Sequence, residues 1–117
     1  MTIREIAETL DATWLCCEEE GGRVLRTAFA SDMMSDVLAY VKDQAVLITG
    51  LCNPQVVRTA EMMDMVCIVF VRGKRPDETV LSLARQKDIT ILATPYRMFT
   101  ACGLLYENGL EGGCDVS

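Results

Sequence analysis

The sequence predicts a single α/β domain in which a mostly parallel sheet carries helices on both faces. Half of the 117 residues are apolar and 24% are charged, which is the composition of a globular domain. From residue 31 onward, helical patterns alternate with short apolar runs, and this alternation is typical of consecutive βα units. We expect the domain to span residues 1–110 and residues 111–117 to form a flexible tail.

The segment before residue 31 has a different pattern. Thr2 and Glu5 match a capping box, and the apolar residues that follow recur with helical spacing, so a helix is expected first. Residues 12–19 ("ATWLCCEE") and 23–31 ("RVLRTAFAS") each have the pattern of a short strand. Because a Gly-Gly pair separates them, the two strands are expected to form a hairpin-like amino-terminal portion.

The rest of the chain predicts a regular series of helices and strands. Helices are expected over residues 32–43, 54–64, 76–88 and 95–108. The strands between them are "AVLITG", "VCIVFV" and "ITILAT". Their uninterrupted apolar character indicates a sheet covered on both faces, and right-handed crossovers would make them parallel. Asn53-Pro54 and Thr94-Pro95 are expected to place a capping residue before a proline at the first helical position, and Arg75-Pro76 repeats the proline.

Composition argues against several classes of function. The longest apolar run, "MVCIVFV", is far shorter than the roughly 20 residues of a membrane span, so no membrane association is expected. The amino end lacks the pattern of a secretion signal, which predicts a cytoplasmic location and reduced cysteines. A net charge of −6 and the absence of histidine argue against nucleic-acid binding and imidazole-based catalysis. We expect no cofactor and no metal.

A basic, glycine-containing loop follows one strand in "VFVRGKRPDETV". The strand-to-helix loops of such a sheet gather at its carboxyl edge, where open α/β folds usually bind ligands. Six residues of these loops are candidates for binding an anionic metabolite or nucleotide: Asn53, Arg72, Gly73, Lys74, Thr94 and Tyr96. A solvated basic turn is the alternative, because Asp77 and Glu78 occupy the first turn of the next helix and oppose a bound phosphate. The P-loop pattern of nucleotide kinases is absent.

The six cysteines are a weak indication of metal or redox chemistry, because no C-x-x-C pair occurs. Cys67 and Cys102 fall in apolar segments and are expected to be buried. Cys52 precedes the amino end of a helix, which can lower the pKa of a thiol. A redox or metal role centred on Cys52, with Cys16 and Cys17, is therefore a third and less favoured hypothesis.

Two further features have both a structural and a functional interpretation. Asp32 and Asp36 are spaced to share one helix face, but capping and solvation explain them as well as catalysis does, so no catalytic residue is assigned. Seven methionines occur, and adjacent pairs such as Met33-Met34 cannot both point inward. The excess is suited to a subunit interface.

The segments "RGKRPDETVLSLARQKDITILATPYRMFTACGLLY" and "ASDMMSDVL" resemble the DRTGG domain family, and the resemblance covers residues 3–110. The block "TPYRMFTACGLL", preceded by the "RPDETV" helix start, is its strongest part. The sequence departs from the two family signatures. Leu51-Cys52 stands where the family has Asp-Arg, and Val71-Arg72-Gly73 stands where it has Thr-Gly-Gly.

The resemblance implies an α/β fold similar to the amino-terminal domain of HPr kinase/phosphorylase. Related domains in some pyrophosphatases look like regulatory or dimerising modules rather than catalysts. We therefore expect a small stand-alone regulatory or interaction domain that is not an enzyme and that forms a homodimer, with an unknown protein partner. Sensing of an anionic small molecule at the carboxyl edge is the alternative.

Overall fold

The computed structural model describes residues 1–41 and 44–112 and has the expected α/β fold. Its strands are β1 (Thr13–Cys16), β2 (Thr27–Ala30), β3 (Val46–Thr49), β4 (Cys67–Phe70), β5 (Thr90–Ala93) and β6 (Glu111–Gly112). Its helices are α1 (Ile3–Thr9), α2 (Met34–Tyr40), α3 (Pro54–Met62), α4 (Glu78–Gln86) and α5 (Met98–Glu107), with a 3₁₀ turn at Glu18–Glu20. The strands form one mixed sheet in the order β1-β5-β4-β3-β2-β6.

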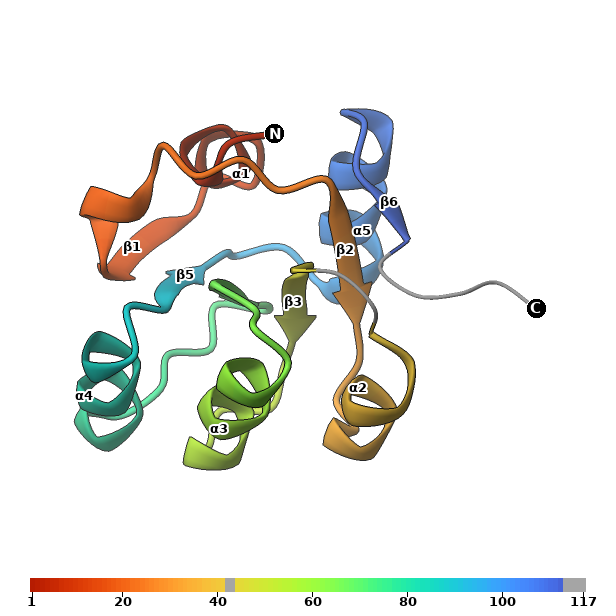
Figure 1. Cartoon of the computed structure of the whole chain (residues 1–117). Helices are drawn as coiled ribbons and strands as arrows, with labels where there is room; N and C mark the ends of the chain where they lie inside the picture. The colour runs from red at the N-terminus through yellow and green to blue at the C-terminus, as the bar shows by residue number, and fades with distance from the viewer. Residues whose placement is uncertain (42–43, 113–117) are drawn as a thin grey trace.

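The chain connections place the helices in two layers. β2, β3, β4 and β5 are parallel neighbours, and successive crossovers put α2, α3 and α4 on one face of the sheet (Figure 1). The connection from β5 to β6 crosses the other face through α5, which lies there with α1 (Figure 1). Only β1 is antiparallel to its neighbour, β5, at one edge of the sheet.

Two apolar cores follow from the alternation of side chains along the strands. Leu47, Ile68 and Phe70 face the layer of α2, α3 and α4. Val69 and Leu92 face α1 and α5. Because both faces of β3, β4 and β5 are covered, every residue of these strands is buried, which explains their uninterrupted apolar sequence.

The amino-terminal portion confirms one expectation and corrects another. Thr2 and Glu5 form the predicted capping box, with bonds of 3.1 Å and 2.8 Å between each side chain and the other residue's N–H. The predicted hairpin is wrong, because β1 pairs with β5 and β2 pairs with β3 and β6. The Gly-Gly turn does not join paired strands. The carbonyl oxygen of Gly21 accepts the N–H of Arg4, and the chain then runs from the edge of the sheet at β1 across to β2 (Figure 1).

The proline signals are correct for only one helix. Pro54 is the first residue of α3, as expected. α4 begins after Pro76, and α5 begins after Pro95, with Arg97 at its N-cap position. The expectation that Thr94 caps the last helix is therefore wrong. Its hydroxyl donates instead to the carbonyl oxygen of Leu10, at 2.6 Å.

The carboxyl-terminal residues extend the sheet. Glu111 and Gly112, which were expected to begin the tail, pair with β2 as β6. Residues 113–117 of that expected tail lie outside the described residues. Within residues 1–41 and 44–112, no helix is both long and apolar enough to span a bilayer.

The first prediction separates two phenylalanines that the sequence does not distinguish. Phe70 is fully buried under α3 and α4, whereas Phe99 is 90% exposed on α5. The sequence "TPYRMFT" instead predicts that Phe99 faces the sheet, and this prediction is wrong. Phe70→Ala is expected to lower the free energy of unfolding by about 3–5 kcal/mol, as buried aromatic truncations do. Phe99→Ala is the matched control and, in protein dilute enough to be monomeric, should change it by less than about 0.5 kcal/mol. Guanidinium denaturation of both variants measures this, and equal losses would contradict the orientation of α5.

Candidate functional site

The carboxyl ends of β4 and β5 lie where an open sheet of this topology commonly holds a ligand. α4 and α5, which follow these strands, leave on opposite faces of the sheet (Figure 1), and ligands usually bind in the crevice between such strands. Here two hydrogen bonds join the loops: the N–H of Arg72 donates to Tyr96 O (2.7 Å), and the N–H of Gly73 donates to Thr94 O (2.8 Å). This pair of bonds, the loop bridge, closes the crevice with backbone.

The loop bridge depends on left-handed backbone at two consecutive residues. Arg72 has φ 61° and Gly73 has φ 67°. Glycine adopts this conformation freely, whereas it costs a residue with a side chain about 1–2 kcal/mol. A Cβ atom on Gly73 would meet open space, so the backbone angle is what requires glycine there. The strain at Arg72 is offset by the bonds that the turn makes.

Asp32 connects the end of β2 to the end of β3. Its Oδ1 accepts the N–H of Gly50 (2.7 Å) and the hydroxyl of Thr49 (3.1 Å). Asp32 lies before α2 rather than on it, while Asp36 lies in the first turn of that helix. The predicted placement of two carboxylates on one helix face is therefore wrong, and Asp32 is a link between loops.

The Arg72 guanidinium lies over Gly50, close to this link. A Cβ atom on Gly50 would stand 2.7 Å from Nη2 of Arg72 and 3.5 Å from Oδ1 of Asp32. Gly50 thus leaves the space in which the cation approaches the carboxylate. Burial raises the pKa of the half-buried Cys52 thiol, and the nearby Lys74 and Arg72 charges oppose this only partly. The expectation of a lowered thiol pKa at Cys52 is therefore wrong.

Asn53 lies at the N-cap of α3, directly after Cys52. Its backbone is extended, as expected of a capping residue, but its side chain makes no capping hydrogen bond. Its Oδ1 atom is buried and has no hydrogen-bond partner. Leaving a buried acceptor unsatisfied costs about 1–3 kcal/mol. Asn53 thus has an unused acceptor, and the residue before it in the chain, Cys52, lies near the charges of Arg72 and Lys74.

The structure divides the six predicted site residues into two groups. Asn53, Arg72 and Lys74 lie with Asp32 and Gly50 on the β3 side of the loop bridge. Gly73, Thr94 and Tyr96 belong to the bridge itself or to the β1 side. The Thr94 hydroxyl is fully buried and already occupied by Leu10 O. A shallow hollow of about 340 Å³ lies on that side, lined by Asp11, Thr13, Gly73, Arg75, Ala93, Thr94 and Pro95.

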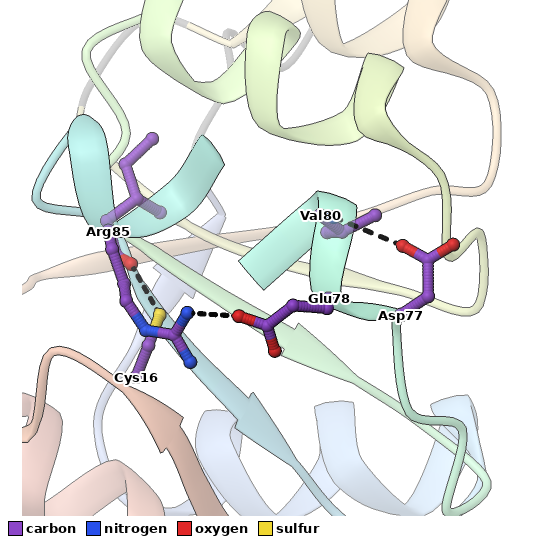
Figure 2. Close-up of polar contacts among 6 residues, drawn as sticks. Cys16, Asp77, Glu78, Val80 and Arg85 are labelled. Carbon is purple, nitrogen blue, oxygen red and sulfur yellow. Dashed lines mark hydrogen bonds and ion pairs between the residues drawn. The ribbon is translucent and has the colours of Figure 1, made fainter. Parts of the chain in front are cut away.

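The amino end of α4 is occupied by the carboxylate of its own N-cap residue. Figure 2 shows the Asp77 side chain directed at the N–H of Val80, at 3.2 Å. Glu78, the first residue of the helix, pairs with Arg85 at 2.6 Å (Figure 2). Negative charge at a helix amino end disfavours a second anion there. An anion attracted by the basic loop must therefore lie nearer to α3 than to α4.

The other cysteines that the structure describes lie in surroundings that suppress their reactivity. The Cys16 thiol donates to Ile89 O at 3.3 Å (Figure 2). Burial raises the pKa of Cys16 and Cys67, and raises the pKa of Cys17 to about 12. Such thiols are poor nucleophiles at neutral pH. Among the residues that the structure describes, no three Cys, Asp or Glu side chains are grouped as metal ligands.

Comparison with known proteins decides the family. The DRTGG domain profile matches residues 5–107. The chain belongs to the DRTGG domain family. A solved structure of the CBS and DRTGG domains of the regulatory region of Clostridium perfringens pyrophosphatase, complexed with the activator diadenosine tetraphosphate, superposes with a TM-score of 0.71 at 20% identity. The match covers 89% of this chain and 45% of that chain. No curated protein sequence matches.

Membership confirms the resemblance inferred from the sequence. The two positions at which this DRTGG domain departs from the family signature, Leu51-Cys52 and Val71-Arg72-Gly73, lie together in the structure, since Arg72 acts on the pKa of Cys52. Asp32 and Gly50 were not predicted as site residues. The sequence signal that could have identified them is their position, because Asp32 closely follows the strand β2 and Gly50 directly follows the strand β3.

The second prediction tests the Asp32 link. Asp32→Ala removes the acceptor of the buried Gly50 N–H and of the Thr49 hydroxyl, and is expected to destabilise the domain by about 1–3 kcal/mol. Asp32→Asn keeps an oxygen at the same place and should lose less. Urea denaturation of the two variants measures the difference. Equal stability of Asp32→Ala and the parent would show that water replaces the link.

Proposed function

We propose that this DRTGG domain is a non-catalytic regulatory module that acts as a homodimer formed along α5. The observation that carries the proposal is the exposure of two aromatic side chains, Phe99 (90%) and Tyr106 (77%), on the outer face of that helix. Aromatic residues are enriched in protein interfaces and contribute much of their binding energy. On a free surface they would expose large apolar area to water.

The composition of α5 supports the same proposal. Ala101 and Leu105 cover the sheet, yet the outer face is also apolar, and Glu107 is its one charged residue. A surface helix normally has a polar outer face, whereas a helix that is apolar all round is normally buried. The buried thiols with raised pKa and the occupied Thr94 hydroxyl favour a role without catalysis.

The third prediction concerns the oligomeric state. Size-exclusion chromatography with light scattering should give the mass of a dimer, and Phe99→Asp should give a monomer, because a charge would be buried at the contact. Met62→Asp is the matched control. Met62 is 69% exposed on α3, across the sheet from α5, and its substitution should leave the dimer intact. A parent protein that stays monomeric at millimolar concentration would overturn the proposal.

A second candidate function is the sensing of an anionic metabolite or nucleotide at the carboxyl edge. The specific observation that favours it is that Arg72 and Lys74 lie near Cys52, whose neighbour in the chain, Asn53, has a buried Oδ1 atom without a hydrogen-bond partner. Cations supply charge and the amide supplies directional hydrogen bonds, which together suit a phosphate carried on a polar group. The similar pyrophosphatase region is complexed with a nucleotide activator, which is consistent with this candidate.

The fourth prediction tests this candidate by thermal stability. A bound ligand at about 100 times its dissociation constant should stabilise the domain by roughly 2.7 kcal/mol. Adenine nucleotides, diadenosine tetraphosphate and inorganic phosphate are the probes. Arg72→Ala and Lys74→Ala should abolish the shift, while Lys87→Ala should keep it, because Lys87 pairs with Glu61 at the opposite end of α4. Absence of any shift in the parent would remove this candidate.

A further inference from the structure

The hollow on the β1 side of the loop bridge is formed by three segments of the chain. Asp11 and Thr13 line it from the start of β1, Thr94 from the end of β5, and Gly73 and Arg75 from the loop after β4. Because β1 is antiparallel to β5, its first residues lie at the carboxyl end of β5. The hollow is therefore the open space beside the closed crevice, at the edge where open α/β sheets usually bind ligands.

The three segments are tied together through Thr94. Its hydroxyl donates to Leu10 O at 2.6 Å, which joins the end of α1 to the end of β5. Its carbonyl oxygen accepts the N–H of Gly73 at 2.8 Å, which joins the loop after β4 to the same point. Thr94 itself is fully buried. A site whose walls are already fixed by hydrogen bonds needs little further ordering when a ligand binds.

Asp11 and Arg75 bring opposite charges to the two sides of the hollow. Asp11 precedes β1, Arg75 follows β4, and β5 lies between these two strands. Neighbouring strands are about 4.8 Å apart, so β1 and β4 are separated by roughly 10 Å. Of the ion pairs between residues that the structure describes, none includes Asp11 or Arg75. Both charges thus face the hollow without neutralising each other through direct contact.

The size and the charges of the hollow together select a class of ligand. Its volume of about 340 Å³ is near the lower limit of ligand pockets, roughly 300–1,000 Å³, which suits a small metabolite better than a nucleotide. A simple anion drawn to Arg75 would be repelled by Asp11, and a simple cation drawn to Asp11 would be repelled by Arg75. A small molecule that carries both charges is attracted by both residues.

We infer that this hollow binds a small zwitterion with one ammonium and one carboxylate group, as in a free α-amino acid. The Asp11 carboxylate accepts hydrogen bonds from the ammonium group, and the Arg75 guanidinium donates to the carboxylate group. The Thr13 hydroxyl supplies a further polar contact beside Asp11. This inference goes beyond the proposed function, because it depends neither on the homodimer along α5 nor on the anion site near Cys52.

NMR titration of the isotope-labelled full chain tests the ligand class. The standard amino acids are added one at a time, and at least one should shift the amide signals of Thr13, Gly73 and Arg75. The N-acetyl derivative of that amino acid lacks the ammonium group, and its carboxamide lacks the carboxylate. Each derivative should bind about tenfold or more weakly, because each loses a charge-assisted hydrogen bond.

Matched substitutions test the two charged residues. Asp11→Asn and Arg75→Gln should each weaken amino-acid binding about tenfold or more. Asp11 has left-handed backbone (φ 50°), which asparagine tolerates, so the first variant should keep the fold. Asp88→Asn is its control, because Asp88 has the same backbone conformation (φ 56°) but lies before β5, at the opposite edge of the sheet. Arg58→Gln, at an exposed position on α3, is the control for Arg75→Gln. Both controls should bind as the parent does.

Several results would overturn the inference. They are the absence of binding by every amino acid, a derivative that binds as tightly as the free amino acid, and binding that Asp11→Asn or Arg75→Gln leaves unchanged. None of them bears on the homodimer, which light scattering measures separately. The anion site near Cys52 is also tested independently, through Arg72→Ala and Lys74→Ala.

Discussion

The loop bridge between the β4–α4 and β5–α5 loops is the constraint on which the candidate surfaces depend. Its two hydrogen bonds require left-handed backbone at Arg72 and Gly73, and this turn directs the Arg72 side chain over Gly50 towards Asp32. The same bonds hold the carbonyl oxygens of Thr94 and Tyr96, and the chain bends at Pro95 and Tyr96 before α5 begins at Met98. One local conformation thus closes the usual crevice of the sheet, places a cation beside β3 and sets the start of the outer helix.

Much of the fold could be predicted because buried segments have recognisable patterns of apolar residues in the sequence. β3, β4 and β5 are covered on both faces, so each is an unbroken apolar run, and the helices between them have apolar stripes. The sequence could not show that the predicted hairpin was wrong. The residue pattern of a segment predicts that it forms a strand, but it does not predict with which other strand it pairs. β1 and β2 look like neighbours around a Gly-Gly pair, yet β1 pairs with β5, and β2 pairs with β3 and β6. Partner choice is a long-range property that a single sequence does not display.

The orientation of α5 and the make-up of the site were harder to predict for a related reason. α5 is apolar on nearly every face, so its sequence has no period that tells Phe99 from Leu105. The six site residues were chosen by their positions after strands, and whether they bind a ligand stays a prediction. Thr94 was chosen by the same rule, but its hydroxyl is taken by a carbonyl 84 positions away, in a contact that only the folded chain creates.

The two proposed surfaces both adjoin the loop bridge. Coupling between sites requires a shared element whose arrangement both sites influence. Arg72 belongs to the cationic group through its guanidinium and to the loop bridge through its N–H, which is bonded to Tyr96 just before α5. An anion that draws the guanidinium away from Gly50 acts on the turn that holds the amino end of α5. Since α5 is the helix along which the homodimer is proposed to form, ligand binding and dimerisation would share this turn, and each would influence the other reciprocally.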